Sequence, residues 1–205
     1  MLRRQLVERL ERLRSELPGA AGYCIRDLGS GETFEADAGA VYPAASTIKI
    51  PVLLSPLRLA QEGTIDRHRP IPIDPAARVE GGGVLETWSE PYPALSAAHL
   101  AALMMDFSDN FATNLLIDRV GMDRIGIDLR AWGLRDTRLR RRMMDLEAAR
   151  AGRENVTTPR DLVTLLERLH GGGILDAAHT VRALSMMKRR GSVYSASGSS
   201  APLLR

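Results

Sequence analysis

Residues 46–49 of this chain, Ser-Thr-Ile-Lys, stand directly before the apolar run Ile-Pro-Val-Leu-Leu-Ser-Pro-Leu-Arg-Leu at positions 50–59. A run of this length predicts a buried helix, and at about 3.6 residues per turn Ser46 and Lys49 would share one face of it. A lysine amine within reach of a serine hydroxyl is a base beside a nucleophile. The same residues also fit a serine helix cap followed by a surface lysine. The four residues alone leave both interpretations open.

The composition is that of a single ordinary globular domain. The 205 residues are 44% hydrophobic and 26% charged, which excludes the disordered and membrane classes. A formal net charge of +3 does not require a nucleic-acid partner. Cys24 is the single cysteine, so no internal disulfide is possible, and the four histidines lack the spacing of metal ligands. We therefore predict no metal and no cofactor.

The start of the chain bears on where the protein resides. The first 17 residues are charged and amphipathic and contain no apolar signal region, and no stretch of the chain is apolar enough to span a membrane. As written, the chain is expected to be cytoplasmic, with no membrane partner. A true start upstream of Met1 would make the expected location periplasmic or extracellular.

Hydrophobic periodicity predicts two strands near the N-terminus and helices over most of the remainder. Regularly spaced leucines predict a helix over residues 2–17, whose apolar stripe needs a partner surface. Alternating segments at 21–28 and 32–37, joined through glycines, predict a β-hairpin. Further helices are predicted at 46–62, 97–107, 111–120, 123–132, 160–170 and 176–190, with Ser96 as an N-cap and a loop at 133–157.

A second motif, Ser108-Asp109-Asn110, lies between two predicted helices. With residues 46–49 it resembles the S-x-x-K and S-D-N motifs of the class A β-lactamases and their penicillin-recognising relatives. The similarity extends to the glycine-rich residues 79–85, to 103–105, to 112–117 and to Asn-Val-Thr-Thr-Pro-Arg-Asp-Leu at 155–162, and it covers nearly all of residues 12–190. This joint pattern favours chemistry at Ser46 over a helix cap.

The resemblance implies an α/β (α+β) fold of the serine β-lactamase/transpeptidase type. An all-helical lobe would lie beside an antiparallel sheet flanked by helices, with the active site between them. Ser46 resembles the acylated nucleophile, Lys49 its base, Ser108 the proton shuttle to the leaving nitrogen, and Asn110 the amide that holds the substrate side chain. An ordinary lysine, with a pKa of about 10.4, is charged at neutral pH, so burial and nearby donors must lower the Lys49 pKa.

The chain departs from the family at its C-terminal end, because no Lys-Thr-Gly or Lys-Ser-Gly follows the helix predicted at 176–190. In the family that strand supplies one oxyanion N–H, and losing one such donor costs roughly a hundredfold to a thousandfold in rate. We therefore expect an incomplete sheet and impaired activity. The expected organisation is a β-lactamase-like domain over residues 1–190, truncated or frameshifted, and a low-complexity tail over 191–205. Alternatively, the sequence is an incomplete copy.

A second departure lies in the loop 138–158, where class A enzymes carry Glu-x-x-x-Asn to position the deacylating water. Here Asp145 is the first candidate for that carboxylate and Glu147 the second, while pairing with nearby arginines is the alternative for both. A missing general base would slow deacylation by about a hundredfold to ten-thousandfold. The expectation is a protein that acylates but turns over poorly.

Together these observations predict a monomeric β-lactamase-like serine hydrolase acting on a β-lactam or a related peptide-like amide. Trp88 is a candidate for lining the substrate groove, or else a packing aromatic. One alternative is a penicillin-recognising pseudoenzyme or sensor that binds at Ser46 without release. Another is a binding module without catalysis, which would use the basic run at 138–142, but the small net charge and the lack of interleaved aromatics disfavour nucleic acid. That run contains Arg138, Arg140, Arg141 and Arg142.

Overall fold

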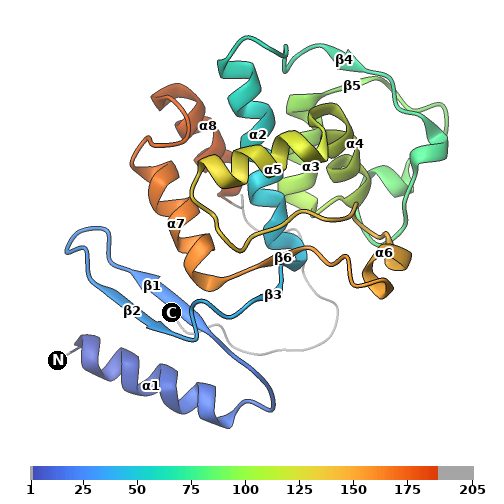
Figure 1. Cartoon of the computed structure of the whole chain (residues 1–205). Coiled ribbons are helices and arrows are strands. Elements are labelled where there is room, and N and C mark those ends of the chain that lie inside the picture. The colour runs from blue at the N-terminus through green and yellow to red at the C-terminus, as the bar shows by residue number, and fades with distance from the viewer. Residues whose placement is uncertain (1, 189–205) are drawn as a thin grey trace.

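The fold is described here from a computed structural model of residues 2–188. Helices cover most of this part of the chain, and the strands are short (Figure 1). The helices are α1 Leu2–Glu16, α2 Lys49–Gln61, α3 Ala97–Phe107, α4 Asn110–Val120, α5 Met122–Ala131, α6 Leu146–Arg150, α7 Pro159–His170 and α8 Ala177–Met187, with 3₁₀ turns η1 Ala45–Ile48, η2 Pro75–Ala77 and η3 Leu85–Thr87. The strands are β1 Tyr23–Arg26, β2 Thr33–Ala36, β3 Tyr42–Pro43, β4 Pro70–Ile71, β5 Leu95–Ser96 and β6 Val156–Thr157.

Helix α2 forms the centre of the helical lobe. Most of the apolar run that follows Lys49 is buried, and Val52, Leu53 and Leu54 have no exposed surface. The helices α3, α4, α5 and α8 all pack against α2 (Figure 1). The buried helix predicted from residues 50–59 is therefore confirmed. Because the helix is enclosed by its neighbours, its N-terminal end has a fixed position in the molecule.

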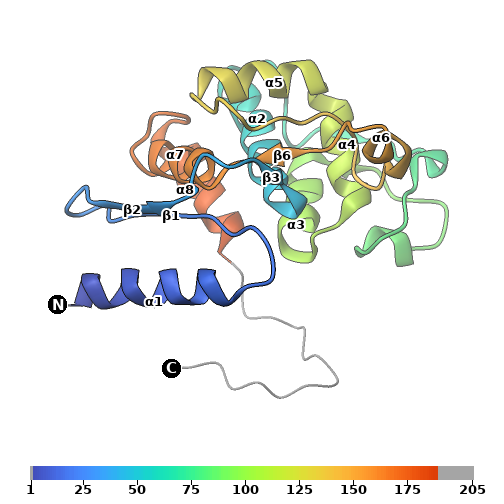
Figure 2. The same ribbon diagram turned by 60° about the horizontal axis from the view of Figure 1, so that its bottom comes forward.

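The predicted hairpin is also confirmed and forms a separate layer. Strands β1 and β2 pair antiparallel, with Tyr23 opposite Ala36 and Arg26 opposite Thr33. Helix α7 packs on one side of the hairpin and α1 lies along the other (Figure 2). The Tyr23 hydroxyl donates to the Glu11 carboxylate of α1 at 2.7 Å. This sheet flanked by helices and the helical lobe beside it are the two parts that the resemblance implied.

The apolar stripe of α1 is covered less than its sequence predicts. Leu6, Leu13 and Leu17 all remain largely exposed. A helix of 15 residues is about 22 Å long, whereas a strand of four residues spans only about 13 Å. The hairpin is therefore too short to cover the whole stripe.

The segment 133–157, predicted as a loop, contains the short helix α6 and ends in strand β6. β6 pairs with β3, so that Val156 lies opposite Pro43, and a bridge also joins Val156 to Arg138. The periodicity of two-residue strands is too short to detect in a sequence. This pairing matters because β3 leads directly into the turn that carries Ser46.

The start of that segment is tied to α7 by the buried carboxylate of Asp161. It accepts the N–H groups of Asp136 and Thr137 at 2.9 and 2.7 Å, and the Thr137 hydroxyl at 2.8 Å. Thr158 caps α7 by accepting the Asp161 N–H. One side chain therefore supplies the acceptors for a turn more than 20 residues earlier in the chain.

Two sequence predictions reach beyond this part of the chain. The last predicted helix is present as α8 over Ala177–Met187, and residues 189–190 lie outside the described residues, as does the predicted tail 191–205. Among residues 2–188 no helix is long and apolar enough to cross a membrane.

We expect Asp161→Ala to lower the free energy of unfolding by at least about 3 kcal/mol. The substitution removes the acceptor of the Asp136 and Thr137 N–H groups, while the Thr137 hydroxyl keeps the Thr157 hydroxyl as a partner. Urea denaturation measures the change. The control is Asp106→Ala, an exposed aspartate on α3, which should change stability by no more than about 0.5 kcal/mol. Equal effects of the two substitutions would contradict the role of Asp161.

Candidate active site

Ser46 and Lys49 lie at the entrance of α2, as predicted, but Ser46 belongs to the 3₁₀ turn η1. Such a turn has about three residues per turn, so positions i and i+3 stand in line. Ala45 just before the serine has a φ of 45°, a conformation that residues with a Cβ rarely adopt. The Ala44 N–H is held by the Asn155 carbonyl at 2.8 Å. The serine is therefore presented on a strained backbone that neighbouring segments hold in place.

The second motif forms the tight turn between α3 and α4. Ser108 ends α3 in the left-handed conformation, with φ 55° and ψ 29°. Asp109 is completely buried and caps α4 by accepting the Ala112 N–H at 2.8 Å, while its other oxygen accepts the Leu85 N–H at 2.8 Å. Asp109 thus anchors the loop.

The two motifs meet at the Lys49 amine. Its Nζ donates to the Ser108 carbonyl at 2.6 Å, to the Ser108 Oγ at 2.9 Å and to the Asn110 Oδ1 at 2.9 Å. The Ser108 Oγ in turn lies 3.1 Å from the Ser46 Oγ. The sequence predicts that the lysine reaches the Ser46 hydroxyl itself. In the structure the Ser108 hydroxyl lies between them and connects the two groups.

Burial lowers the pKa of Lys49 to about 8. Its side chain is 3% exposed, and removing an ammonium group from water disfavours the charged form. The carboxylate of Asp109 acts in the opposite direction and limits the decrease. With such a pKa, roughly a tenth of the molecules carry a neutral amine at pH 7, and about half do so at pH 8. The lysine can therefore accept a proton at physiological pH.

The glycines 81–83 approach this turn closely. The Asn110 Nδ2 donates to the Gly81 carbonyl at 2.9 Å. At Gly83, where φ is 140°, an added Cβ would lie 2.5 Å from the Asp109 Cγ. From the sequence alone, this run of three glycines indicates no more than a turn. In the structure Gly83 leaves room for the Asp109 side chain.

Asn114 is a site residue that sequence reasoning did not single out. Its Oδ1 accepts the Met143 N–H at 2.8 Å, and its Nδ2 donates to the Met143 carbonyl at 3.1 Å. These two bonds hold the segment before α6 against α4. The segment is thereby tied to the helix that begins at Asn110.

The two carboxylates proposed for deacylation lie beyond Met143. Asp145 is exposed and caps α6 by accepting the Ala148 N–H at 2.9 Å, and Glu147 is exposed in the first turn of the same helix. Neither carboxylate makes a hydrogen bond to Ser46, Lys49 or Ser108. A catalytic role for Asp145 stays a prediction.

The two residues predicted to bind substrate have structural contacts. Both ends of the Asn110 amide are used inside the protein, by Lys49 and Gly81. Trp88 is half-buried and packs against the hydrophobic core. Binding of substrate by Asn110 and Trp88 stays a prediction. Among residues 2–188 no group of three or more histidine, cysteine, aspartate or glutamate side chains is arranged to hold a metal ion.

Comparison with known proteins identifies similar sequences and structures. Residues 5–194 match the model of the Beta-lactamase enzyme family. An imipenem-hydrolyzing beta-lactamase of Enterobacter cloacae is 26% identical over 82% of this chain and 58% of its own length. The beta-lactamase regulatory protein BlaB of Streptomyces cacaoi is 29% identical over 64% of this chain and 42% of its own length. The chain thus spans about half the length of these curated relatives.

Solved structures agree with the sequence matches. The structure of PBP-A superimposes with a TM-score of 0.81 at 32% identity, covering 90% of this chain and 68% of PBP-A. A mutant of PBP-A, described as an acyl-enzyme complex with penicillin G, has the same TM-score.

We expect the Lys49 side chain to titrate with a midpoint near pH 8. The chain has two lysines, Lys49 and Lys188, so ¹³C labelling of lysine gives two sets of side-chain signals, and Lys49→Gln assigns them. The chemical shift of the ε-carbon, followed by NMR from pH 6 to 11, measures the midpoint. A midpoint above pH 10 would contradict the effect of burial.

The same decrease in pKa predicts how stability depends on pH. Folded Lys49 releases its proton near pH 8, whereas the unfolded chain keeps that proton up to about pH 10.5. Between these values the unfolded state binds more protons, so the contribution of Lys49 to the free energy of unfolding rises with pH. Urea denaturation between pH 7.5 and 10 should therefore show a smaller rise in Lys49→Gln than in the parent protein. Equal slopes would argue against the shift.

Proposed function

The chain belongs to the Beta-lactamase enzyme family, and from this we propose that it is a serine acyl-transfer enzyme that opens β-lactam or related amide bonds through Ser46. The observation that carries the proposal is the Ser46–Ser108–Lys49 cluster. It places a hydroxyl, a connecting hydroxyl and an amine with a pKa of about 8 in one chain of contacts. This is the arrangement that activates a serine nucleophile.

The proposed acylation step follows this chain of contacts. Ser46 donates its hydroxyl proton to the Ser108 Oγ, and Ser108 passes its own proton to the neutral Lys49 amine. The Ser46 Oγ then bonds to the amide carbonyl carbon. As the carbon–nitrogen bond breaks, Lys49 returns the proton through Ser108 to the leaving nitrogen. Protons are conserved, and the product is an ester of Ser46 with a free amine on the opened ring.

The negative charge on the carbonyl oxygen needs a donor in the transition state. Ser46 lies in the first turn of η1, where backbone N–H groups have no acceptor within the helix. We assign the Ser46 N–H as one donor of the oxyanion hole. A single donor of this kind contributes roughly a hundredfold to a thousandfold in rate.

We further propose that the acyl-enzyme is hydrolysed slowly. Deacylation needs a base that directs water at the ester, and neither candidate carboxylate makes a hydrogen bond to Ser46, Lys49 or Ser108. Asp145 accepts a hydrogen bond within α6, and Glu147 is exposed on the same helix. A carboxylate that must first leave its helix cap is a poor general base.

A long-lived acyl-enzyme would also suit a sensor, which was one alternative from the sequence. The similarity to a beta-lactamase regulatory protein supports keeping this second candidate. The alternative of a binding module that uses the whole run 138–142 receives less support. Arg141 pairs with Glu154, and Arg142 pairs with Asp118, so two of its arginines are already neutralised.

Fluorescent penicillin tests the acylation. We expect covalent labelling of the parent protein, with a mass increase on the peptide that contains Ser46, and no labelling of Ser46→Ala. Ser30→Ala, in the β-hairpin turn, is the matched serine control and should label normally. Labelling that survives Ser46→Ala would place the nucleophile elsewhere.

Stopped-flow hydrolysis of nitrocefin tests the slow turnover. We expect a burst of about one product per enzyme, followed by a steady state at least about a hundredfold slower, because acylation is assisted by Lys49 and deacylation lacks a placed base. A fast steady state without a burst would exclude a long-lived acyl-enzyme. A linear trace with slow acylation would place the limiting step at Ser46.

Removal of the Ser108 hydroxyl tests the proton path. We expect both Ser108→Ala and Ser108→Gly to lower the acylation rate by about a hundredfold or more, because Ser46 then has no connection to the amine. Glycine adopts the left-handed backbone at this position without the steric cost that alanine would carry. A loss confined to the alanine variant would therefore assign the effect to the backbone and not to the hydroxyl.

A further inference from the structure

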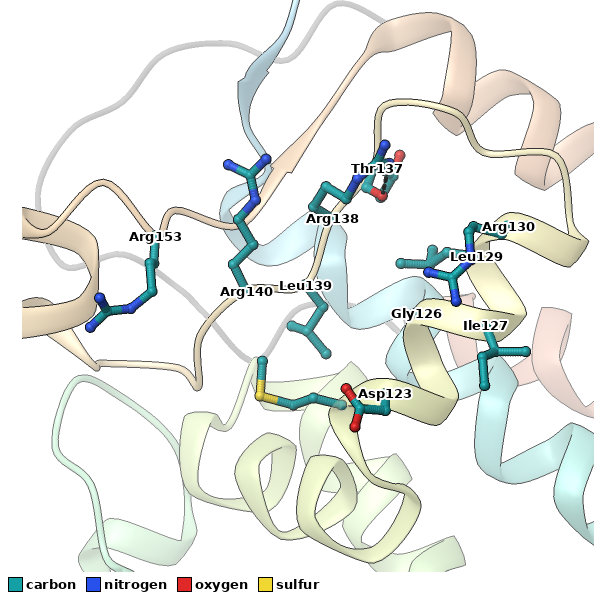
Figure 3. A pocket seen from close by; sticks show the side chains of 11 residues that line it. Asp123, Gly126, Ile127, Leu129, Arg130, Thr137, Arg138, Leu139, Arg140 and Arg153 are labelled. Atoms are coloured by element: carbon teal, nitrogen blue, oxygen red, sulfur yellow. Dashed lines mark hydrogen bonds between the residues drawn. The ribbon is translucent and has the colours of Figure 1, made fainter.

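A cleft of about 600 Å³ opens on a part of the molecule that the proposed chemistry does not use. One wall is helix α5, and the other is the segment that runs from Thr137 to Arg140, with Arg153 beside it (Figure 3). None of Ser46, Lys49, Ser108 or Asn110 lines it. The cleft is therefore a site in its own right.

The cleft combines apolar walls with basic side chains. Leu129 is buried and Leu139 is half-buried in the walls, with Met122 at one end. Arg130 extends from α5 along Gly126, and an added Cβ on that glycine would lie 3.6 Å from the Arg130 guanidinium. The remaining basic side chains are Arg138, Arg140 and Arg153, which belong to the opposite side (Figure 3).

The four arginines of the cleft have no ion-pair partner in the described part of the chain. Among residues 2–188, no ion pair joins any of the four to a carboxylate, whereas the adjacent Arg141 and Arg142 are both paired. Asp123 is the single acidic residue among those that line the cleft. With four arginines and one aspartate among its lining residues, the cleft carries a net positive charge that attracts anions.

We propose that this cleft binds a small ligand that carries two or more anionic groups, a di- or polyphosphate or a polycarboxylate. Arginine binds both kinds of group through two parallel hydrogen bonds, and each kind would be bound more strongly between apolar walls than on an open surface. The volume is that of a site for a small molecule. The arginines come from both walls, so a ligand with several anionic groups uses them together.

The shape of the site disfavours a nucleic-acid strand. A strand-binding groove combines an extended basic track with aromatic side chains on which bases stack. This cleft is local, and no aromatic side chain lines it. The cleft shares no residue with the proposed reaction site at Ser46, so binding in the cleft and acylation of Ser46 can be measured separately.

Isothermal titration calorimetry of the full chain tests the site, with pyrophosphate in one arm and citrate in the other at constant ionic strength. We expect saturable binding of at least one of them with a stoichiometry of one. Binding of pyrophosphate alone assigns a phosphate ligand, and binding of citrate alone assigns a polycarboxylate. No saturable binding of either would overturn the proposal.

A double substitution in the cleft supplies the specific test. Arg140→Ala with Arg153→Ala should weaken binding by about tenfold or more, because two charge-assisted contacts are lost. The side chains of both are exposed, so the fold should be retained, and circular dichroism checks this. Arg9→Ala with Arg12→Ala, on the exposed face of α1, removes the same charge elsewhere and should leave binding within about twofold. Equal weakening by both pairs would show that binding depends only on the net charge of the protein. That result would overturn the proposal of a site in this cleft.

A gain of affinity provides an independent check. Asp123→Asn removes the single carboxylate of the lining and should strengthen binding of the same anion several-fold. Unchanged or weaker binding by Asp123→Asn would contradict the location of the anion site in this cleft. Tighter binding of a short DNA oligonucleotide than of pyrophosphate would also contradict the proposal, if the cleft variants do not weaken the binding of the DNA.

Discussion

Lys49 carries its amine into the interior at the start of α2, where the side chain is only 3% exposed. A buried ammonium group is tolerated only when each of its N–H donors has an acceptor. Those acceptors come from Ser108 and Asn110, on the turn between α3 and α4. The central helix and that turn therefore hold each other in one arrangement, and the same contacts that satisfy the lysine also bring the Ser108 hydroxyl to Ser46.

The backbone around these residues has left-handed conformations, and at one position it leaves room only for a glycine. Ala45 and Ser108 both have positive φ, and Gly83 leaves room for the buried Asp109. Such conformations cost about 1–3 kcal/mol each and persist where the surrounding structure determines them. Here the determining contacts are the Asn155 carbonyl on the Ala44 N–H and the two backbone hydrogen bonds that the Asp109 carboxylate accepts. Stability of the enclosed helical lobe thus maintains the geometry of the candidate site.

The segment 137–157 connects the two sites of the molecule. On one side its residues Arg138 and Arg140 line the basic cleft. On the other, Val156 pairs with Pro43 just before the turn that carries Ser46, and Met143 is bound by Asn114. The buried Asp161 carboxylate fixes where this segment begins. An anion in the cleft would therefore bind to a segment that also borders Ser46.

The sequence by itself determined the helices with clear periodicity and caps, the β-hairpin, and the two motifs that identify Ser46, Lys49 and Ser108. These features depend on neighbours a few positions apart, which a sequence displays directly. It could not determine that Ser108 stands between Ser46 and Lys49, that Asp145 caps α6, or that Arg141 and Arg142 are paired while Arg138 and Arg140 face a cleft. Only the tertiary structure decided these, because each depends on contacts between groups distant in the chain or on which of several possible partners a side chain meets.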